Sequence, residues 1–261
     1  MQYTSAADAA NMSGLRLALT IGVPGPWSES AKKIFEYKSI PYVPVAQYMS
    51  EPNEDLVAWT GIRNAPVAVW QDEPGRSNYQ DIVALAERIK PDPPLLPRDP
   101  GLRQTVLGIS ADICSETGWG WKRRIIMGRR PREEADGAAS ESNSKLDMKV
   151  MQNAYAATER EAELAADYLS AMLDNFAARL TQQHKDGSTY FVGADVTACD
   201  IHWACFSAML EPMPDAVNPM PDWLRPSYAY LGPILEDHKH QILLDHRDHM
   251  FEKHLGLPLD Y

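Results

Sequence analysis

The sequence is poor in cysteine, in basic charge and in long apolar runs. Its three cysteines, Cys114, Cys199 and Cys205, are odd in number and have no metal-type spacing. They predict reduced thiols in a cytoplasmic protein rather than a disulfide framework. No run approaches the roughly 20 apolar residues of a membrane helix, and the first residues lack a basic-then-apolar leader. We therefore expect no export and no membrane partner.

The shortage of basic charge limits the possible partners. The formal net charge is -11, from 36 acidic and 25 basic residues. Such a chain repels nucleic acid and anionic lipid unless it carries a local basic patch. The one candidate patch, KRR at 122–124 with RRPR at 129–132, is short and is followed at once by Glu133 and Glu134. We therefore expect no nucleic-acid partner. With 44% hydrophobic residues the chain is typical of a globular protein.

The first part of the chain predicts a strand, a helix and a second strand. Apolar residues alternate over Leu15–Ile21, which is the period of a strand. From Ser28 the apolar residues recur at helical spacing, with Lys32 and Lys33 on the opposite face. Residues 42–45 predict a second strand, and its proline favours a sheet edge. A βαβ unit of this kind favours parallel strands.

A second strand and helix follow, and then a proline-rich boundary. Val67–Trp70 predicts a short strand, and Ile82–Ile89 is periodic at helical spacing with Asn78 as its cap. Residues 90–100, KPDPPLLPRDP, carry too many prolines for a helix or a central strand. We take this segment as a domain boundary.

Beyond the boundary the patterns are helical. Expected are a long helix from about Val106, an exposed loop over Pro131–Ser144, a helix of roughly eight turns over 151–180, and further helices over Asp195–Glu211 and Ile234–His254. The predicted organisation is a flexible N-terminal arm over 1–14, an α/β domain over 15–90, a linker over 91–100 and an all-helical domain over 101–261.

Four segments together resemble the cytosolic glutathione transferases. They are GPWSESAKKIFEYKSIPY at 25–42, NAPVAVW at 64–70, LLPRDPGLRQ at 95–104 and FVGADVTACDI at 191–201. The resemblance covers nearly the whole chain after residue 14. It implies an α/β plus all-α fold, in which a thioredoxin-like N-terminal domain binds glutathione and a C-terminal helical domain binds the second substrate. It also implies a homodimer, with glutathione as co-substrate and no metal.

The resemblance implies where glutathione binds. The backbone of Ala65, before a cis-Pro66, would pair with the cysteinyl part of glutathione. Ser77 and Asn78 stand where the family has a Glu/Gln-Ser pair for the γ-glutamyl group. That pair does not match residue by residue, and the alternative for these two residues is helix capping alone. Trp27 would contribute its indole N–H or a wall of the site.

The residue that activates the thiol is less clear from the sequence. The family uses a hydroxyl or a thiol after the first strand, because the thiolate is the nucleophile. The matching position here is Gly25, which has no side chain to donate. Ser28 is our candidate catalytic residue, and backbone N–H groups at the same helix start are the second option. The alternative for Ser28 is a purely structural N-cap.

The second substrate would contact the first helices of the helical domain. Trp119, Trp121 and Arg124 suit a flat, acidic or hydrophobic compound. The alternative is that the tryptophans pack in the core and the arginines face solvent. Two glycines beside Trp119 predict a bent or weakened helix, which packing alone does not require.

Two further patterns favour structural roles. Thr197 and Asp200 form a capping box before an apolar run, so that Asp200 is expected to stabilise the fold rather than to act in catalysis. Asp245, His246 and His249 share a helical face as possible metal ligands. The segment is also rich in Lys, Arg and Asp, which favours a solvated amphipathic helix and no metal.

We therefore expect a transferase that moves the glutathione thiolate to a hydrophobic electrophilic small molecule. The alternative is a non-catalytic ligand-binding or protein-interaction module on the same fold, which the glycine at position 25 favours. A third reading, a metal-binding helical protein, rests on the histidines alone.

Overall fold

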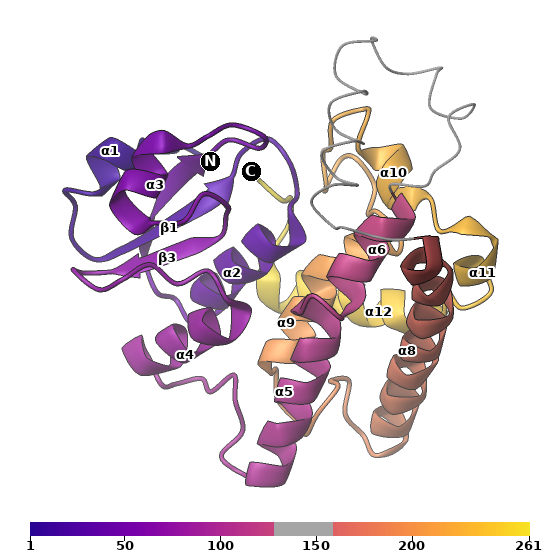
Figure 1. The fold of residues 1–261 in the computed structure, drawn as a ribbon. Helices are drawn as coiled ribbons and strands as arrows, with labels where there is room; N and C mark the ends of the chain where they lie inside the picture. The colour runs from indigo at the N-terminus through magenta and orange to yellow at the C-terminus, as the bar shows by residue number, and fades with distance from the viewer. Residues whose placement is uncertain (128–158) are drawn as a thin grey trace.

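The computed structural model describes residues 1–127 and 159–261, in an α/β part and a helical part (Figure 1). The described strands are β1 at Leu15–Thr20, β2 at Tyr42–Gln47 and β3 at Val67–Trp70, in the order β2-β1-β3. β1 runs parallel to β2 and antiparallel to β3. The predicted parallel pair is confirmed, and β2, which carries Pro44, lies at a sheet edge as predicted.

The alternation of side chains along β1 gives the sheet two buried faces. Leu15, Leu17 and Leu19 join the large core with apolar residues of α2 (Pro26–Tyr37) and α4 (Tyr79–Ile89). Ala18 points the other way, into a small core shared with α1 (Ala6–Ala9) and α3 (Glu54–Thr60). Successive residues of a strand face opposite sides of the sheet, so the sequence pattern decides which helices cover which face.

The N-terminal segment, predicted as an arm over 1–14, carries a β-bridge and a short helix. Thr4 bridges to the outer edge of β2, with its N–H donating to the Pro44 carbonyl at 2.9 Å. Ser5 caps α1, whose Ala6 and Ala9 are buried against α3. Alanines bury little apolar area, so the sequence of this segment shows no strong hydrophobic periodicity.

The helical part surrounds one central helix. Its described helices are α5 (Pro100–Cys114), α6 (Trp119–Met127), α8 (Glu159–Lys185), α9 (Ala198–Phe206), α10 (Arg225–Ala229), α11 (Gly232–Glu236) and α12 (Gln241–Met250), which continues as a π-helical turn over Phe251–Leu255. Every residue of α9 is buried. It packs on α2, α5 and α12, and so joins the two parts of the molecule.

Asp200 holds the start of α9 in place. Its carboxylate accepts from the Thr197 N–H at 2.9 Å and the Thr197 hydroxyl at 2.6 Å, and the predicted capping box is present. Its second oxygen, Oδ1, accepts from the Phe191 N–H at 2.8 Å and lies 2.9 Å from His246 Nε2. The expected structural role of Asp200 is confirmed.

Two expectations about the helical part need comment. The predicted C-terminal helix over Ile234–His254 is wrong in part, because α11 ends at Glu236 and α12 begins at Gln241 with His240 as its N-cap residue. The predicted loop over Pro131–Ser144 lies outside the described residues, as does the first part of the predicted helix over 151–180. Within the described part of α8 the predicted apolar stripe is buried, at Ala165, Leu169, Leu173, Phe176 and Leu180.

Candidate functional site

Four of the predicted glutathione-binding residues lie at one edge of the sheet. β3 begins directly after Pro66, and the Ala65–Pro66 peptide bond is cis. Because β3 is antiparallel to β1, its start lies beside the end of β1 at Thr20. The second residue of β3 exchanges backbone hydrogen bonds of 2.8 and 2.9 Å with the residue before Ser77. The chain therefore returns Ser77 and Asn78 to the same edge.

The start of α4 at this edge is capped as the sequence predicts. Asn78 Oδ1 accepts from the Gln80 N–H at 2.8 Å. Ser77 and Asn78 are both exposed. A helix N-terminus carries partial positive charge and favours anions. The edge therefore offers a positive helix end beside an exposed hydroxyl.

Ser28 is not the N-cap of α2, which corrects the sequence interpretation. The helix begins at Pro26 with Gly25 as its N-cap residue, so Ser28 lies inside the first turn. Its side chain is buried, and its Oγ accepts from the Thr20 N–H at 3.3 Å and lies 3.5 Å from Thr20 Oγ1. A proline is favoured at the first helical position, because its missing N–H would have no intrahelical partner there. Ser28 therefore ties α2 to the end of β1.

The start of α2 has no side-chain cap. Gly25 has an extended conformation, and no side-chain hydrogen bond caps the helix. Its φ of -63° suits any residue, and an added Cβ would meet nothing closer than Ser28 Oγ at 3.9 Å. A side chain at Gly25 would therefore fit without strain. The first-turn N–H groups of Trp27 and Ser28 precede the first intrahelical bond, which the Glu29 N–H donates to the Gly25 carbonyl.

Trp27 joins the two parts of the molecule rather than offering its indole to a ligand. Its Nε1–H donates to the Cys114 carbonyl at 3.0 Å, and its ring meets Phe206 edge-on at 4.9 Å between centroids. The indole therefore lies between the start of α2 and the helical part, and it contacts α5 and α9.

Trp119 belongs to the core, which is the alternative that the sequence left open. It is fully buried, its Nε1–H donates to the Phe206 carbonyl at 3.2 Å, and its ring lies 5.7 Å from that of Trp203. The glycine beside it, Gly120, is required by packing. An added Cβ there would lie 2.4 Å from Phe206 and 2.7 Å from Trp27. The expectation that packing alone does not require this glycine is wrong.

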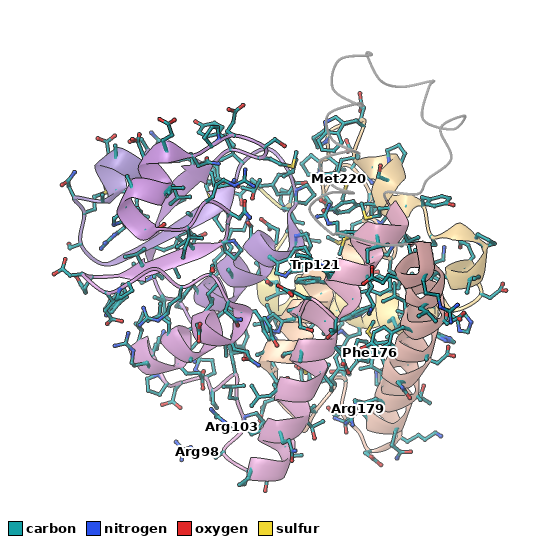
Figure 2. All side chains as sticks on the ribbon, viewed as in Figure 1. Arg98, Arg103, Trp121, Phe176, Arg179 and Met220 are labelled. Carbon is teal, nitrogen blue, oxygen red and sulfur yellow. The ribbon has the colours of Figure 1, made fainter. Side chains whose placement is uncertain are left out.

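Trp121 and Arg124 are half-buried on α6, and Figure 2 marks Trp121 on that helix. The Arg124 guanidinium lies over the rings of Trp27 and Tyr228, at 5.9 and 5.4 Å from their centroids. Its Nη2 also donates to the Tyr228 hydroxyl at 3.1 Å. Arg124 is thus held at the junction of the two parts.

Arg123 is buried although the sequence offered a solvent-facing role for the arginines of α6. Its Nε donates to the Met209 carbonyl at 2.8 Å, and its Nη2 donates to the carbonyls of Tyr228 and Tyr230. Burial lowers the pKa of Arg123 to about 9. Arg123 therefore fixes the chain after α9 and has no part in the site.

The C-terminal segment covers the polar face of α2. Lys32 is fully buried, and its Nζ contacts Glu29 at 2.9 Å and the Asp260 carbonyl at 2.6 Å. Lys33 Nζ donates to the Leu255 carbonyl at 2.8 Å. Burial raises the pKa of Glu29, which Lys32 opposes. The face of α2 that carries Lys32 and Lys33 is therefore a buried ionic contact with the C-terminal segment.

Sequence reasoning missed two polar residues where β1 and β2 end. Thr20 Oγ1 donates to Gln47 Oε1 at 2.8 Å, and Thr20 also contacts Ser28. The available signal was the position of Thr20, the last polar residue of the alternating strand pattern before the turn at Gly22.

The predicted metal ligands near the C-terminus do not form a cluster. His246 is buried with Nε2 on Asp200, whereas His249 Nε2 contacts the Thr189 hydroxyl at 3.3 Å. The predicted solvated helix is wrong for His246, which faces the core. Among the described residues, the side chains that gather as possible metal ligands are Asp174, His238 and His240.

The cysteines are buried as expected for small apolar residues. Cys114, Cys199 and Cys205 are all free thiols within α5 and α9. Burial raises the pKa of each thiol. None is a reactive thiolate at neutral pH, because a raised pKa keeps the proton on sulfur.

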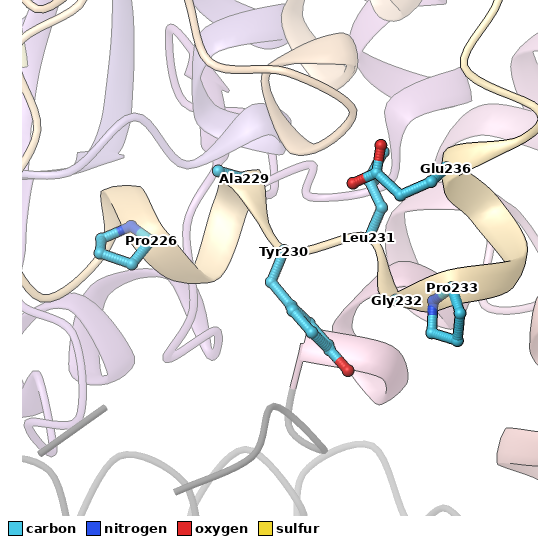
Figure 3. Close-up of a pocket in the computed structure, with 7 residues that line it drawn as sticks. All are labelled: Pro226, Ala229, Tyr230, Leu231, Gly232, Pro233 and Glu236. Atoms are coloured by element: carbon cyan, nitrogen blue, oxygen red, sulfur yellow. The ribbon is translucent and has the colours of Figure 1, made fainter. Parts of the chain in front are cut away.

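Cavities also lie elsewhere among the described residues. A pocket of about 420 Å³ is lined by residues of α10, of α11 and of the two-residue connection between them, among them Tyr230 and Glu236 (Figure 3). A second cavity, of about 640 Å³, lies between the N-terminal segment and α3, and reaches Ile21 after β1. Its lining includes the carboxylates of Glu51, Glu54 and Asp55, so it is unsuited to an anionic peptide.

None of the described helices is long and apolar enough to cross a membrane. The sequence matches no protein-family model and no curated protein sequence. Many solved structures that the fold resembles are glutathione S-transferases.

One is a glutathione S-transferase from Methylobacillus flagellatus KT with glutathione bound, at 15% identity and a TM-score of 0.61, covering 92% of this chain and 96% of that one. Another, from Methylobacterium radiotolerans JCM 2831 in complex with glutathione sulfonate, has 16% identity and a TM-score of 0.57 over 95% and 98% of the two chains. A β-etherase from a Sphingobium species has 14% identity and a TM-score of 0.56 over 86% and 98%. The chain therefore has the glutathione transferase fold, with a thioredoxin-like domain followed by an all-helical domain.

Proposed function

We propose that this chain binds glutathione at the sheet edge and transfers its thiolate to a hydrophobic, electrophilic small molecule. The observation that carries the proposal is the convergence of the Ala65 backbone, the start of α4 and the uncapped start of α2. Two solved structures with this fold contain glutathione or glutathione sulfonate.

In this arrangement each part of glutathione meets a different element. Ala65, before Pro66, pairs through its backbone with the cysteinyl part. Ser77 and Asn78 at the start of α4 bind the γ-glutamyl group, whose carboxylate suits a helix N-terminus. The cysteinyl sulfur then points toward the start of α2.

The thiolate is held by backbone N–H groups of the first turn of α2, at Trp27 and Ser28. The Ser28 hydroxyl does not contact the sulfur, because it is buried and already hydrogen-bonded to Thr20. It acts by holding α2 against the end of β1. A helix N-terminus stabilises a nearby anion by about 0.3–1 kcal/mol. The expected fall in the thiol pKa is therefore less than about one unit.

The second substrate approaches from the helical part. Trp121 and Arg124 on α6 provide its wall, with Arg124 already held by contacts to Trp27 and Tyr228. Trp119 is excluded from this role by its burial. We further propose that the protein is a homodimer. We also propose that it is cytoplasmic, because three free cysteines suit a reducing compartment. Light scattering on the purified chain tests the dimer.

Calorimetry with glutathione, followed by ultraviolet titration of its bound thiol, tests the proposal. Ser28→Ala should retain most of the shift in the thiol pKa. If the Ser28 hydroxyl contacted the sulfur instead, this variant would lose the shift. Ser30→Ala is the matched control, because Ser30 Oγ bonds to the Trp27 carbonyl on the same helix. Absence of binding at millimolar glutathione would refute both the site and the mechanism.

A gain-of-function variant tests the position of the sulfur. Gly25→Ser places a hydroxyl at the start of α2, and a hydrogen bond to a charged group contributes about 1.5–3 kcal/mol. The thiol pKa should fall by a further one to two units or so. Gly108→Ser is the control, because an added Cβ at this exposed glycine of α5 meets nothing within 4 Å.

The alternative function is a non-catalytic ligand-binding or protein-interaction module. Gly25 favours it, because the position that matches the activating residue has no side chain. The same titration separates the two functions. Glutathione that binds with an unshifted thiol pKa, and no turnover with electrophiles, would support the alternative.

A further inference from the structure

Three polar side chains meet on the surface of the helical part, far along the chain from one another. Asp174 lies in the middle of α8, His238 follows α11, and His240 is the N-cap residue of α12. Asp174 Oδ1 lies 2.9 Å from His238 Nδ1 and 2.6 Å from His240 Nε2. Two imidazoles therefore share one carboxylate oxygen.

The three donor atoms have the spacing that a transition-metal ion needs. All lie within 4.8 Å of one another. An ion with bonds of about 2.0–2.2 Å in tetrahedral geometry holds its ligand atoms about 3.3 Å apart. Small rotations of these half-exposed side chains therefore suffice to admit an ion. The two imidazole planes are inclined at 79°, so both ring nitrogens can face one point.

The backbone that carries the histidines is already fixed. The His238 N–H donates to the Leu235 carbonyl at 3.1 Å, and the His240 N–H donates to the His238 carbonyl at 3.0 Å. The ligand set is therefore largely preorganised, and little backbone entropy is lost when an ion binds.

Nearby charge does not oppose a cation. Lys239, between the two histidines, contacts Glu211 at 3.2 Å and Glu236 at 3.7 Å, so its charge is compensated.

We propose that Asp174, His238 and His240 form a binding site for one divalent transition-metal ion such as zinc. His238 coordinates through Nδ1 and His240 through Nε2, and each neutral ring carries its proton on the other nitrogen. Two imidazoles and one carboxylate leave a fourth position for water, as in sites with three protein ligands. The ion would link α8 to the segment between α11 and α12.

The test is zinc calorimetry on the full chain without a histidine tag, after treatment with chelator. We expect one zinc ion per chain, and binding weakened about tenfold or more in both Asp174→Asn and His240→Ala. Cobalt should give the intense visible absorption of a tetrahedral site, and both variants should lose it. His184→Ala is the control, because this exposed histidine lies on the same helix but outside the cluster.

Three outcomes would overturn the proposal. They are no zinc binding at micromolar concentrations, undiminished zinc affinity in either variant, and an equal loss in His184→Ala. Circular dichroism of each variant separates loss of a ligand from loss of the fold. The assay contains no glutathione, so its result is independent of the proposed transferase function.

Discussion

The buried side chain of His202 makes the free energy of unfolding of this protein fall as the pH decreases. It is fully buried in α9, where Nδ1 lies 3.0 Å from the Ser110 hydroxyl and the ring meets Tyr79 edge-on. Its Nε2 has no hydrogen-bond partner among the described residues. Burial lowers the pKa of His202 from 6.5 to about 3. The folded protein therefore keeps this imidazole neutral where the unfolded chain protonates it.

The sign and size of the effect follow from that difference. Between pH 6.5 and about pH 3 the unfolded state binds one more proton at this site than the folded state does. Stability is therefore fully present above pH 6.5 and falls as the pH decreases, by about 1.4 kcal/mol per pH unit. Over the whole window the loss amounts to about 5 kcal/mol.

Denaturant unfolding of the wild type and His202→Gln at several pH values from 7 to 4 measures this contribution. The variant should show a shallower loss of unfolding free energy, and contributions from other groups cancel in the comparison. His184→Gln controls for the removal of an exposed histidine. Equal slopes in the wild type and His202→Gln would refute the reasoning, whatever the stability of the variant at neutral pH.

Three further substitutions and one control test the packing and the buried polar contacts of the fold, each by denaturant unfolding. Gly120→Ala should lower the free energy of unfolding by about 1–3 kcal/mol, because its Cβ overlaps two aromatic rings. Gly108→Ala, with open space around it, should be neutral or stabilising. Equal effects of the two substitutions would contradict the packing argument. Lys32→Met should cost about 3–5 kcal/mol by leaving Glu29 buried without its cation, and a neutral result would contradict that ion pair. Asp200→Ala should cost about 3 kcal/mol or more through several unpaired buried donors, and a loss below 1 kcal/mol or so would contradict its structural role.

Local patterns in the sequence predicted much of the fold. The alternation in β1, the caps at Asn78 and Asp200, and the apolar stripe of α8 each act over a few residues, and each is present in the structure. Such features depend on neighbours in the chain, which a sequence displays directly.

The features that sequence patterns did not show depend on residues far apart in the chain. Lys32 looks solvated on a helical wheel, yet the chain terminus near Asp260 covers it. Gly120 looks like a weak point of a helix until Phe206 is packed against it. The cluster at Asp174 joins residues more than 60 positions apart. Spacing along the chain carries no signal for any of these contacts.

The candidate site was predictable in part, because it depends both on local sequence and on contacts between distant residues. The resemblance predicted that Gly25 matches the activating position, but the sequence pattern began the helix at Ser28, whereas α2 begins at Pro26 with Gly25 as its N-cap residue. The role of Ser28 could not be predicted from the sequence, because whether its hydroxyl faces a ligand or Thr20 depends on how α2 packs on β1.

The pKa of the thiol of bound glutathione tests the central claim most directly. Ultraviolet titration of the complex should give a pKa below that of free glutathione, by up to about one unit, because the first-turn N–H groups of α2 favour the thiolate. A bound thiol that titrates as free glutathione does would contradict the account.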